Sequence, residues 1–419
     1  MSPPLGALHV SSPSFPLVGN TFPVALLFSL HVIVAEYSVG AIQIASAVEW
    51  WGARRHSAPA LRYARALGTS YYLVFSMGAT LAVFAVVLVT GLWARQIGEV
   101  VNVFAPLVGV AFGLFLILTP LLVWYRNSFG TMSPARHALL GAGVAFWQTL
   151  FVVLIVGIDT YLITPGQAGL AAASLNPPYW PLLIHRLAGN LSWTALFLGA
   201  VAMFRLRHAR DESERDFQLW AARLNLRVGL LFALVMPIGG FVLVEVLKHA
   251  QPGYFENLVG GGGVLMVVQE LLVGVVMIGG NLALSAERRA DAAGADVTGI
   301  GATVLSALGM VVACLPTAVL PASLALVRYA GLAVATAVTA VHLLLRRRIG
   351  PHNQPHGVRL PRLGGQGRAA LVTIGVASMV TSVYMGYIKE HARGDYAIYG
   401  ELRKSAARGN FDPPPSTYP

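Results

Sequence analysis

Ten long apolar runs divide this sequence. Each has about 20 residues or more with few charges, the length that an α-helix needs to cross a hydrocarbon layer about 30 Å thick. Charged residues make up only 11% of the chain, against about 25% in an average soluble protein. The sequence therefore predicts an all-α, polytopic membrane protein of about ten transmembrane helices and excludes a water-soluble globule. The runs are 22–48, 67–93, 101–125, 138–163, 180–205, 218–248, 261–285, 297–319, 324–346 and 368–389.

Arginines occur in the loops that follow the odd-numbered spans, and the other loops carry almost none. Because cytoplasmic loops are enriched in Lys and Arg, this alternation predicts that both termini lie on the outer side. The same topology explains the net charge of +11, so we expect no nucleic-acid partner. The arginines are Arg54, Arg55, Arg62, Arg65, Arg126, Arg136, Arg207, Arg210, Arg215, Arg288, Arg289, Arg346, Arg347, Arg348, Arg359, Arg362 and Arg368.

No separate soluble domain is apparent, and residues 1–403 are expected to form a single transmembrane domain. Residues 404–419 are polar and rich in proline, which predicts a flexible C-terminal tail. Cys314 is the one cysteine. A Cys-x-x-Cys-His attachment of haem c is therefore excluded, and any cofactor must be held non-covalently.

Polar side chains inside the spans are costly to place in lipid, so each is a functional candidate. His31 lies in the outer half of the first span, and His185 enters the fifth span from the outer side beside Ala188 and Gly189. An imidazole can ligate haem iron through one ring nitrogen while the other donates to a carbonyl. Hydrogen bonds and small-residue contacts between helices explain these residues equally well.

Glu390 and Arg393 stand in a charged run at the outer end of the tenth span. Such a run is commonly no more than a solvated cluster at the membrane interface. The predicted topology, however, places His31, His185 and Glu390 at similar depth near the outer face. Residues that hold cofactors in one shared layer must lie at similar depth in the membrane.

Three segments resemble subunit I of the cytochrome bd ubiquinol oxidase family. Members of this family are haem-binding membrane oxidoreductases. Phe28–Val34 resembles the first-helix segment with a haem-ligand histidine, and Tyr179–Gly189 resembles the fifth-helix segment with the histidine of low-spin haem b. The most specific likeness is Glu390–Arg403, which is similar to the family's Glu-x-x-Arg-x-x-Trp run. The likeness extends over roughly residues 22–250 and 324–403.

The resemblance implies that residues 1–403 form a haem-binding domain with His31 and His185 as axial ligands. Glu390 would serve as an oxygen ligand or near-haem carboxylate, and Arg393 would offset the charge of haem propionates. The implied cofactor is haem b, with a second haem and haem d left open.

The chain also departs from the family pattern. Two third-helix glutamates of the family correspond here to Val110 and Leu118, and the family's exterior quinol-binding loop has no counterpart. Ala330 occupies the place of the ligand methionine, for which Met266 is the candidate replacement. Glu36, expected among apolar residues, is the candidate proton relay in place of the missing acids.

The resemblance implies an oxidoreductase subunit of a bacterial cytoplasmic membrane. It would transfer electrons from quinol or cytochrome c to oxygen or to a partner subunit. A second membrane subunit or a homodimer is the expected assembly.

A different class of function stays open at this point. In it the chain is a cofactor-free polytopic transporter, with Glu36, Glu270 and Arg328 on a substrate or proton path and the histidines as packing groups. The sequence shows no inverted repeat, which speaks against this alternative.

Overall fold

The computed structural model describes residues 19–165, 169–259, 264–287, 296–315, 326–346 and 363–404, and every structural statement refers to these. Within them, nine helical segments are long and apolar enough to cross a membrane. Val297–Ala313 is an apolar helix of only 17 residues. The prediction of an all-α polytopic membrane bundle is confirmed, with nine long spans and one shorter helix where ten spans were expected.

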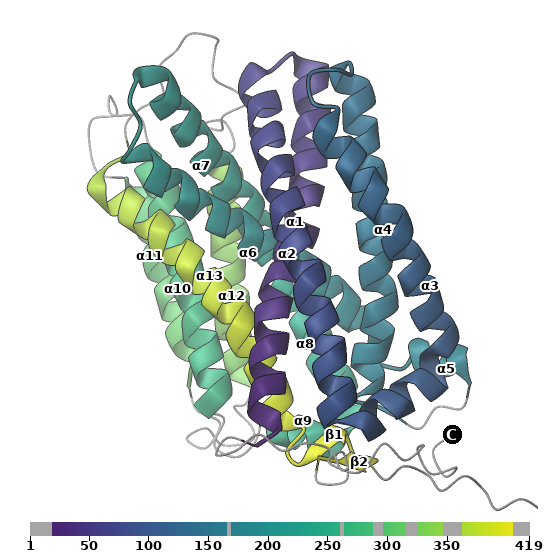
Figure 1. Cartoon of the computed structure of the whole chain (residues 1–419). Coiled ribbons are helices and arrows are strands. Elements are labelled where there is room, and N and C mark those ends of the chain that lie inside the picture. Colours follow the sequence, from purple (N-terminus) through teal and green to yellow (C-terminus); the bar gives the residue numbers. More distant parts are fainter. Residues whose placement is uncertain are drawn as a thin grey trace, which may run out of the picture.

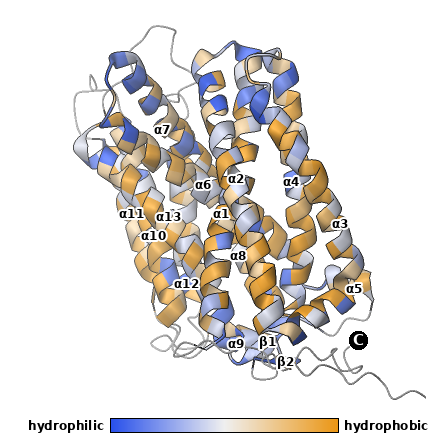
Figure 2. Ribbon diagram, viewed as in Figure 1, coloured by the Kyte–Doolittle hydropathy of each residue, from blue (hydrophilic) through white to orange (hydrophobic). Residues whose placement is uncertain are grey.

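The helices run alternately up and down the bundle (Figure 1). The long ones have cores richer in apolar than polar residues, and their polar residues gather toward the ends (Figure 2). The elements are α1 Thr21–Arg55, α2 Ala58–Leu92, α3 Ala94–Asn127, α4 Pro134–Tyr161, α5 Leu170–Ser174, α6 Tyr179–Leu206, α7 Glu212–Ala233, α8 Met236–Ala250, α9 Pro252–Val259, α10 Val264–Ala286, α11 Val297–Ala313, α12 Leu326–Arg346, α13 Gly365–Ala392, β1 Tyr396–Ile398 and β2 Leu402–Arg403.

The two ends of the bundle differ. The described arginines of the odd-numbered loops lie toward the upper end in Figure 1, where α1, α3, α6 and α12 finish. We name this the arginine-rich end. The lower end carries α5, α9 and the two short strands, and we name it the hairpin end. The sequence rule that arginines share one side is thus reproduced by the fold.

The predicted span 218–248 is broken into α7 and α8. The break falls at Leu234 and Val235, and Pro237 stands in the first turn of α8. Proline has no N–H to donate to the preceding turn and its ring disfavours a continuing helix, so a helix tends to restart there. The break places the first turn of α8, with the Met236 carbonyl, against α6.

The main core lies where α1, α2, α3, α4, α6, α7, α10 and α13 meet, and it is built mostly of Ala, Leu, Ile and aromatic side chains. Close approach of α1 to α6 depends on Gly40. A Cβ atom added there would lie 2.4 Å from the carbonyl oxygen of Asn190. Small residues allow helix backbones to approach in this way inside a membrane.

The hairpin end is closed by the antiparallel strands β1 and β2, which pair Tyr396 with Arg403 and Ile398 with Leu402. Gly400 adopts a φ of 79° in their turn, a conformation that glycine reaches without strain. The amide of Tyr399 donates to the carbonyl of Leu162 at the end of α4. The segment Glu390–Arg403 thus forms the end of α13 and a hairpin anchored to α4.

Several sequence predictions fall on residues outside the described ranges. They are the flexible tail at 405–419, the span ends at 261–263, 316–319 and 324–325, and the arginines at 288, 289, 347, 348, 359 and 362.

Candidate functional site

His185 lies on α6 and faces the start of α8. Its Nδ1 atom is 3.1 Å from the carbonyl oxygen of Met236. Because a carbonyl only accepts, Nδ1 carries the ring proton and Nε2 retains its lone pair. Cβ atoms added at Gly239 and Gly240 would lie 3.4 Å from His185 atoms, so these two glycines let α8 pack against the imidazole. Histidines that bind metals commonly have their other ring nitrogen bonded to a carbonyl, as here.

His31 lies on α1 and faces another neighbour. The Gly78 backbone on α2 is in hydrogen-bonding contact with its ring. Its Nδ1 atom is buried and has no hydrogen-bond partner among the described residues. A buried ring nitrogen without a partner is uncommon, because desolvation is normally offset by a hydrogen bond.

The two histidines do not face one another through a shared contact. Arg186 follows His185 on α6, and successive helical residues point about 100° apart at about 3.6 residues per turn. Arg186 accordingly points toward α1 and α4 while His185 contacts α8. The predicted layer of residues thus divides into a His185 side and a His31 side on two faces of α6.

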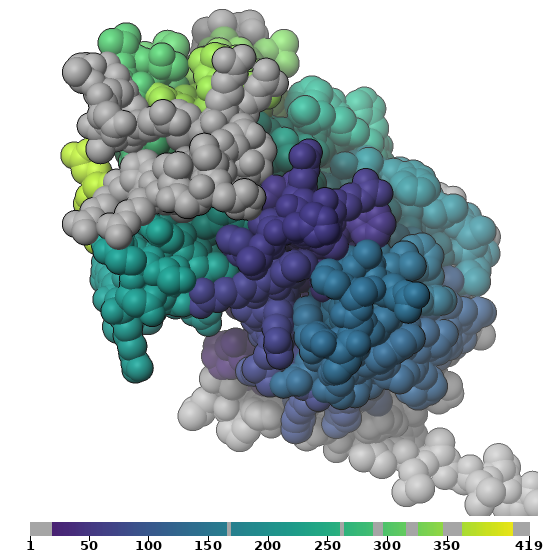
Figure 3. Space-filling model, turned by 90° about the horizontal axis from the view of Figure 1, so that it is seen from above, coloured from purple at the N-terminus to yellow at the C-terminus, as the bar shows by residue number. Residues whose placement is uncertain are grey.

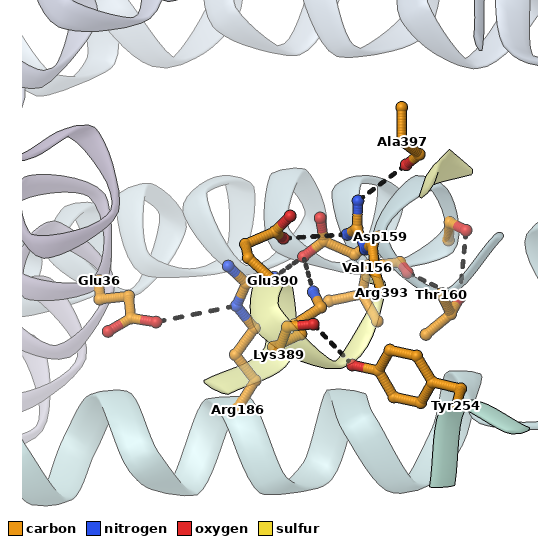
Figure 4. A network of polar contacts seen from close by, with 11 residues as sticks. Glu36, Val156, Asp159, Thr160, Arg186, Tyr254, Lys389, Glu390, Arg393 and Ala397 are labelled. Carbon is orange, nitrogen blue, oxygen red and sulfur yellow. Dashed lines mark hydrogen bonds and ion pairs between the residues drawn. The ribbon is translucent and has the colours of Figure 1, made fainter. Parts of the chain in front are cut away.

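A network of charged side chains lies between these elements at the hairpin end (Figure 4). Arg186 forms an ion pair with Asp159 of α4, and its Nε atom is 3.9 Å from Glu36 of α1. Lys389 of α13 lies 3.7 Å from the same Asp159 oxygen. Ser382, also on α13, donates a hydrogen bond to Glu36. The network therefore joins four helices through two carboxylates and two cations.

Glu36 was expected among apolar residues, and this expectation is wrong. Its carboxylate contacts the Ser382 hydroxyl and the Arg186 guanidinium. These contacts give Glu36 a structural role between α1, α6 and α13. Through Arg186 it stays next to His185, the preceding residue on α6.

Glu390 and Arg393 form an ion pair at the end of α13. The distance between Glu390 Oε1 and Arg393 Nη2 is 3.1 Å, and the Glu390 side chain is 54% exposed. Arg393 is buried, and its Nη1 donates to the carbonyl of Ala397 in β1. The Arg393 Nε atom is buried and has no partner among the described groups. The hairpin thus fixes a guanidinium that retains one donor.

Met266, the predicted replacement ligand, lies in the first turn of α10. It packs against an apolar cluster that includes Leu247, Tyr254 and Ile388. The methionine found beside the His185 face is Met236, because a Cβ atom added at Gly189 would lie 3.3 Å from its sulfur. Sequence reasoning did not single out Met236, although the Met-Pro-x-Gly-Gly run marks an irregular helix there.

The two positions that correspond to the family's third-helix acids have different surroundings. Val110 is exposed on the surface of α3, whereas Leu118 is buried in the main core. Neither position contributes to the network of Asp159 and Arg186 among the described contacts. Both positions are therefore apolar, one at the surface of α3 and one in the core.

The three residues of the alternative transporter path do not form one group: Glu270 pairs with Arg328, and Glu36 contacts other residues. Arg328 of α12 donates to both carboxylate oxygens of Glu270 on α10, at 2.7 and 2.6 Å, and its Nε donates to the Ala313 carbonyl. Glu36 belongs to the network with Arg186 instead. Thus Glu270 and Arg328 are mutually satisfied, and no described contact connects them to Glu36.

Sequence reasoning missed a second buried polar cluster, near the arginine-rich end. His137 Nδ1 is 2.5 Å from Glu49 Oε1, and His137 Nε2 is 2.9 Å from the Tyr125 carbonyl. The Tyr125 hydroxyl donates to the other Glu49 oxygen at 3.1 Å. The cluster joins α1, α3 and α4. Glu49 and Asp159 were detectable in principle, since each is an acid within a helix that spans the membrane.

Known proteins provide a fold likeness but no sequence match. No protein-family model matches the chain, and no curated protein matches it. The structure is similar to a chain of the bd oxidase from Geobacillus thermodenitrificans, with 13% sequence identity and a TM-score of 0.54. The matched region covers 89% of this chain and 97% of that chain. This protein therefore has a polytopic helical membrane fold of the bd oxidase type.

Proposed function

We propose that this chain is a haem-binding oxidoreductase subunit of a bacterial cytoplasmic membrane, with its arginine-rich end on the cytoplasmic side. The observation that carries the proposal is the hydrogen bond from His185 to Met236, because it leaves Nε2 unprotonated within a fold of the bd oxidase type. Histidine ligands of metals commonly have their other ring nitrogen bonded to a carbonyl in this way.

The side chains present at the hairpin end fit haem. Among the described residues, His31 has a buried ring nitrogen without a hydrogen-bond partner. The Nε donor of Arg393 is also buried and has no partner there. A ligand nitrogen and a cation suited to a carboxylate are what haem iron and haem propionates require. Haem b, when bound, would supply one-electron chemistry, and a second haem or haem d stays open.

The roles proposed for the residues follow from their positions. His185 and His31 would hold iron. Met266 is the candidate for a further ligand, and Met236, which lies beside the His185 face, is the alternative. Arg393 would offset propionate charge, and half-exposed Glu390 would act as an oxygen ligand or a carboxylate near haem. Glu36 would influence proton delivery through its contact with Arg186.

The electron donor and acceptor are proposed from the likeness to a bd oxidase. Quinol or cytochrome c would donate, and oxygen or a partner subunit would accept. A second membrane subunit or a second copy of this chain would complete the assembly.

The test is an absorption spectrum of the purified protein with pyridine haemochrome analysis. A Soret band and a haem b haemochrome support the proposal. A well-folded protein that shows no Soret band after expression with sufficient haem supply contradicts it and favours the cofactor-free transporter.

A further inference from the structure

Two cavities meet at Arg205 near the arginine-rich end. The walls of one extend down α1 to Ile33 and Val34, close to His31. One is a groove of about 320 Å³ between α1, α2, α6 and α7, with walls that include Tyr37, Ala66, Phe197 and Val201. The other is a pocket of about 450 Å³ at the end of α6. Arg205 lines both, so an apolar space within the membrane region adjoins a polar space at its edge. Figure 3 looks down on this end.

The groove has the length of one membrane leaflet. It follows α6 from Trp193 to Arg205, a rise of about 18 Å at about 1.5 Å per residue. Half of a hydrocarbon layer about 30 Å thick is about 15 Å. Its walls are mostly apolar, and the hydroxyls of Tyr37 and Ser70 bond to each other at 2.7 Å. An apolar chain aligned with the membrane normal fits such a space.

Positive charge at the mouth of the groove lacks a partner among the residues that the structure describes. Of the described residues that line the groove, Arg205 alone is charged. Its guanidinium makes no hydrogen bond or ion pair with any described residue, and the same holds for Arg210 in the adjoining pocket. The pocket also contains His208, whose Nδ1 is 3.1 Å from the Phe204 carbonyl.

The two carboxylates of the pocket are already engaged. Asp211 caps α7 by accepting from the Glu214 amide at 2.7 Å. Glu214 accepts from Gln218 at 2.6 Å and forms an ion pair with Arg62. The unpaired charge at the mouth is therefore positive, and it suits an anionic group.

We infer that the groove and pocket together bind one anionic phospholipid, with an acyl chain in the groove and the phosphate at Arg205 and Arg210. A free phosphate ion would leave the groove without its apolar occupant. A zwitterionic phospholipid carries its own cation beside the phosphate, so it would neutralise the charge of Arg205 and Arg210 less well than an anionic one. The inference requires no cofactor, although the groove extends to Ile33 and Val34 beside His31.

The test uses native mass spectrometry of the purified full chain in detergent. The probes are phosphatidylglycerol and phosphatidylcholine with identical acyl chains, inorganic phosphate, and ubiquinone. We expect phosphatidylglycerol to bind at least fivefold more tightly than phosphatidylcholine. Arg205→Gln should weaken phosphatidylglycerol binding about fivefold, since one basic residue near an anionic lipid contributes that order of affinity. Arg207→Gln removes an equal charge two residues away that lines neither cavity, and should leave binding unchanged.

A second pair of variants tests the groove itself. Ala66→Trp fills the groove from an exposed position, so it should weaken phosphatidylglycerol binding without disturbing the core. Val83→Trp, at an exposed position on α2 outside the groove, is its control. Equal binding of the two phospholipids, equal effects of Arg205→Gln and Arg207→Gln, or unchanged binding in Ala66→Trp would overturn the inference. Displacement of phosphatidylglycerol by equimolar ubiquinone or inorganic phosphate would also overturn it.

Discussion

The Nδ1 atom of His185 lies 3.1 Å from the carbonyl oxygen of Met236, so one hydrogen bond joins α6 to the first turn of α8. That turn follows the break between α7 and α8 at Leu234 and Val235. The start of α8 thus orients the imidazole of a candidate ligand. The first two predictions depend on this relationship.

His185→Ala should remove low-spin haem b from the protein, because it deletes the imidazole whose Nδ1 is held by the Met236 carbonyl and whose Nε2 is the proposed ligand. The reduced-minus-oxidised α-band and the haem content per chain are the measurements. His249→Ala, at an exposed histidine near the end of α8, should retain both. An unchanged α-band in folded His185→Ala protein would show that His185 is not a ligand.

Met266→Leu should lower the midpoint potential of the low-spin haem while the haem stays bound, since loss of a thioether ligand generally lowers the potential. Met236→Leu is the matched comparison, because its sulfur lies beside Gly189 on the His185 face. Redox titration of both variants gives the answer. A lowered potential in Met236→Leu alone would assign the sixth ligand to α8.

Glu36→Gln should slow oxygen consumption and leave the haem spectra intact, because it removes the carboxylate that links Ser382 to Arg186. Oxygen-electrode rates and spectra of the same preparation test this. Glu245→Gln, at a partly exposed ion pair with Lys248, is the control. Undiminished oxygen consumption in Glu36→Gln would exclude the relay role.

Asp159→Asn should lower the free energy of unfolding by about 2–3 kcal/mol, because it leaves Arg186 and Lys389 without their shared carboxylate. Loss of one partner from a fully buried pair costs about 3–5 kcal/mol, and partial exposure of these side chains reduces that cost. Glu390→Gln, at a half-exposed pair, should cost at most about 1 kcal/mol. Denaturant unfolding in detergent compares the two variants, and equal losses would contradict the ranking.

His137→Ala should destabilise the protein by about 3 kcal/mol, because it leaves the Glu49 carboxylate buried with only the Tyr125 hydroxyl as a partner. Tyr125→Phe removes one hydrogen bond and should cost about 1 kcal/mol. The double variant Glu49→Gln/His137→Ala should be less destabilised than the sum of its single variants. Strict additivity in this cycle would show that the pair is not coupled.

Much of the architecture follows from local features of the sequence. A run such as 67–93 has to be a helix, because a backbone in hydrocarbon must satisfy its own hydrogen bonds. The arginine pattern likewise predicts which helix ends share a side, since it depends on loop composition rather than on packing. His31, His185 and Glu36 were found from sequence because a polar residue in an apolar run is conspicuous by itself.

The partners of these residues were decided only by the tertiary structure. Nothing local brings Asp159 to Lys389, or His137 to Glu49, because each pair joins helices distant in the chain and depends on how they pack. The same holds for Glu36. Most of its neighbours in the sequence are apolar, but its contacts in space are Arg186 of α6 and Ser382 of α13. The sequence by itself determined which segments span the membrane and which side chains are chemically unusual there. Helix packing determined the surroundings of each side chain, because contacts between helices depend on residues far apart in the chain.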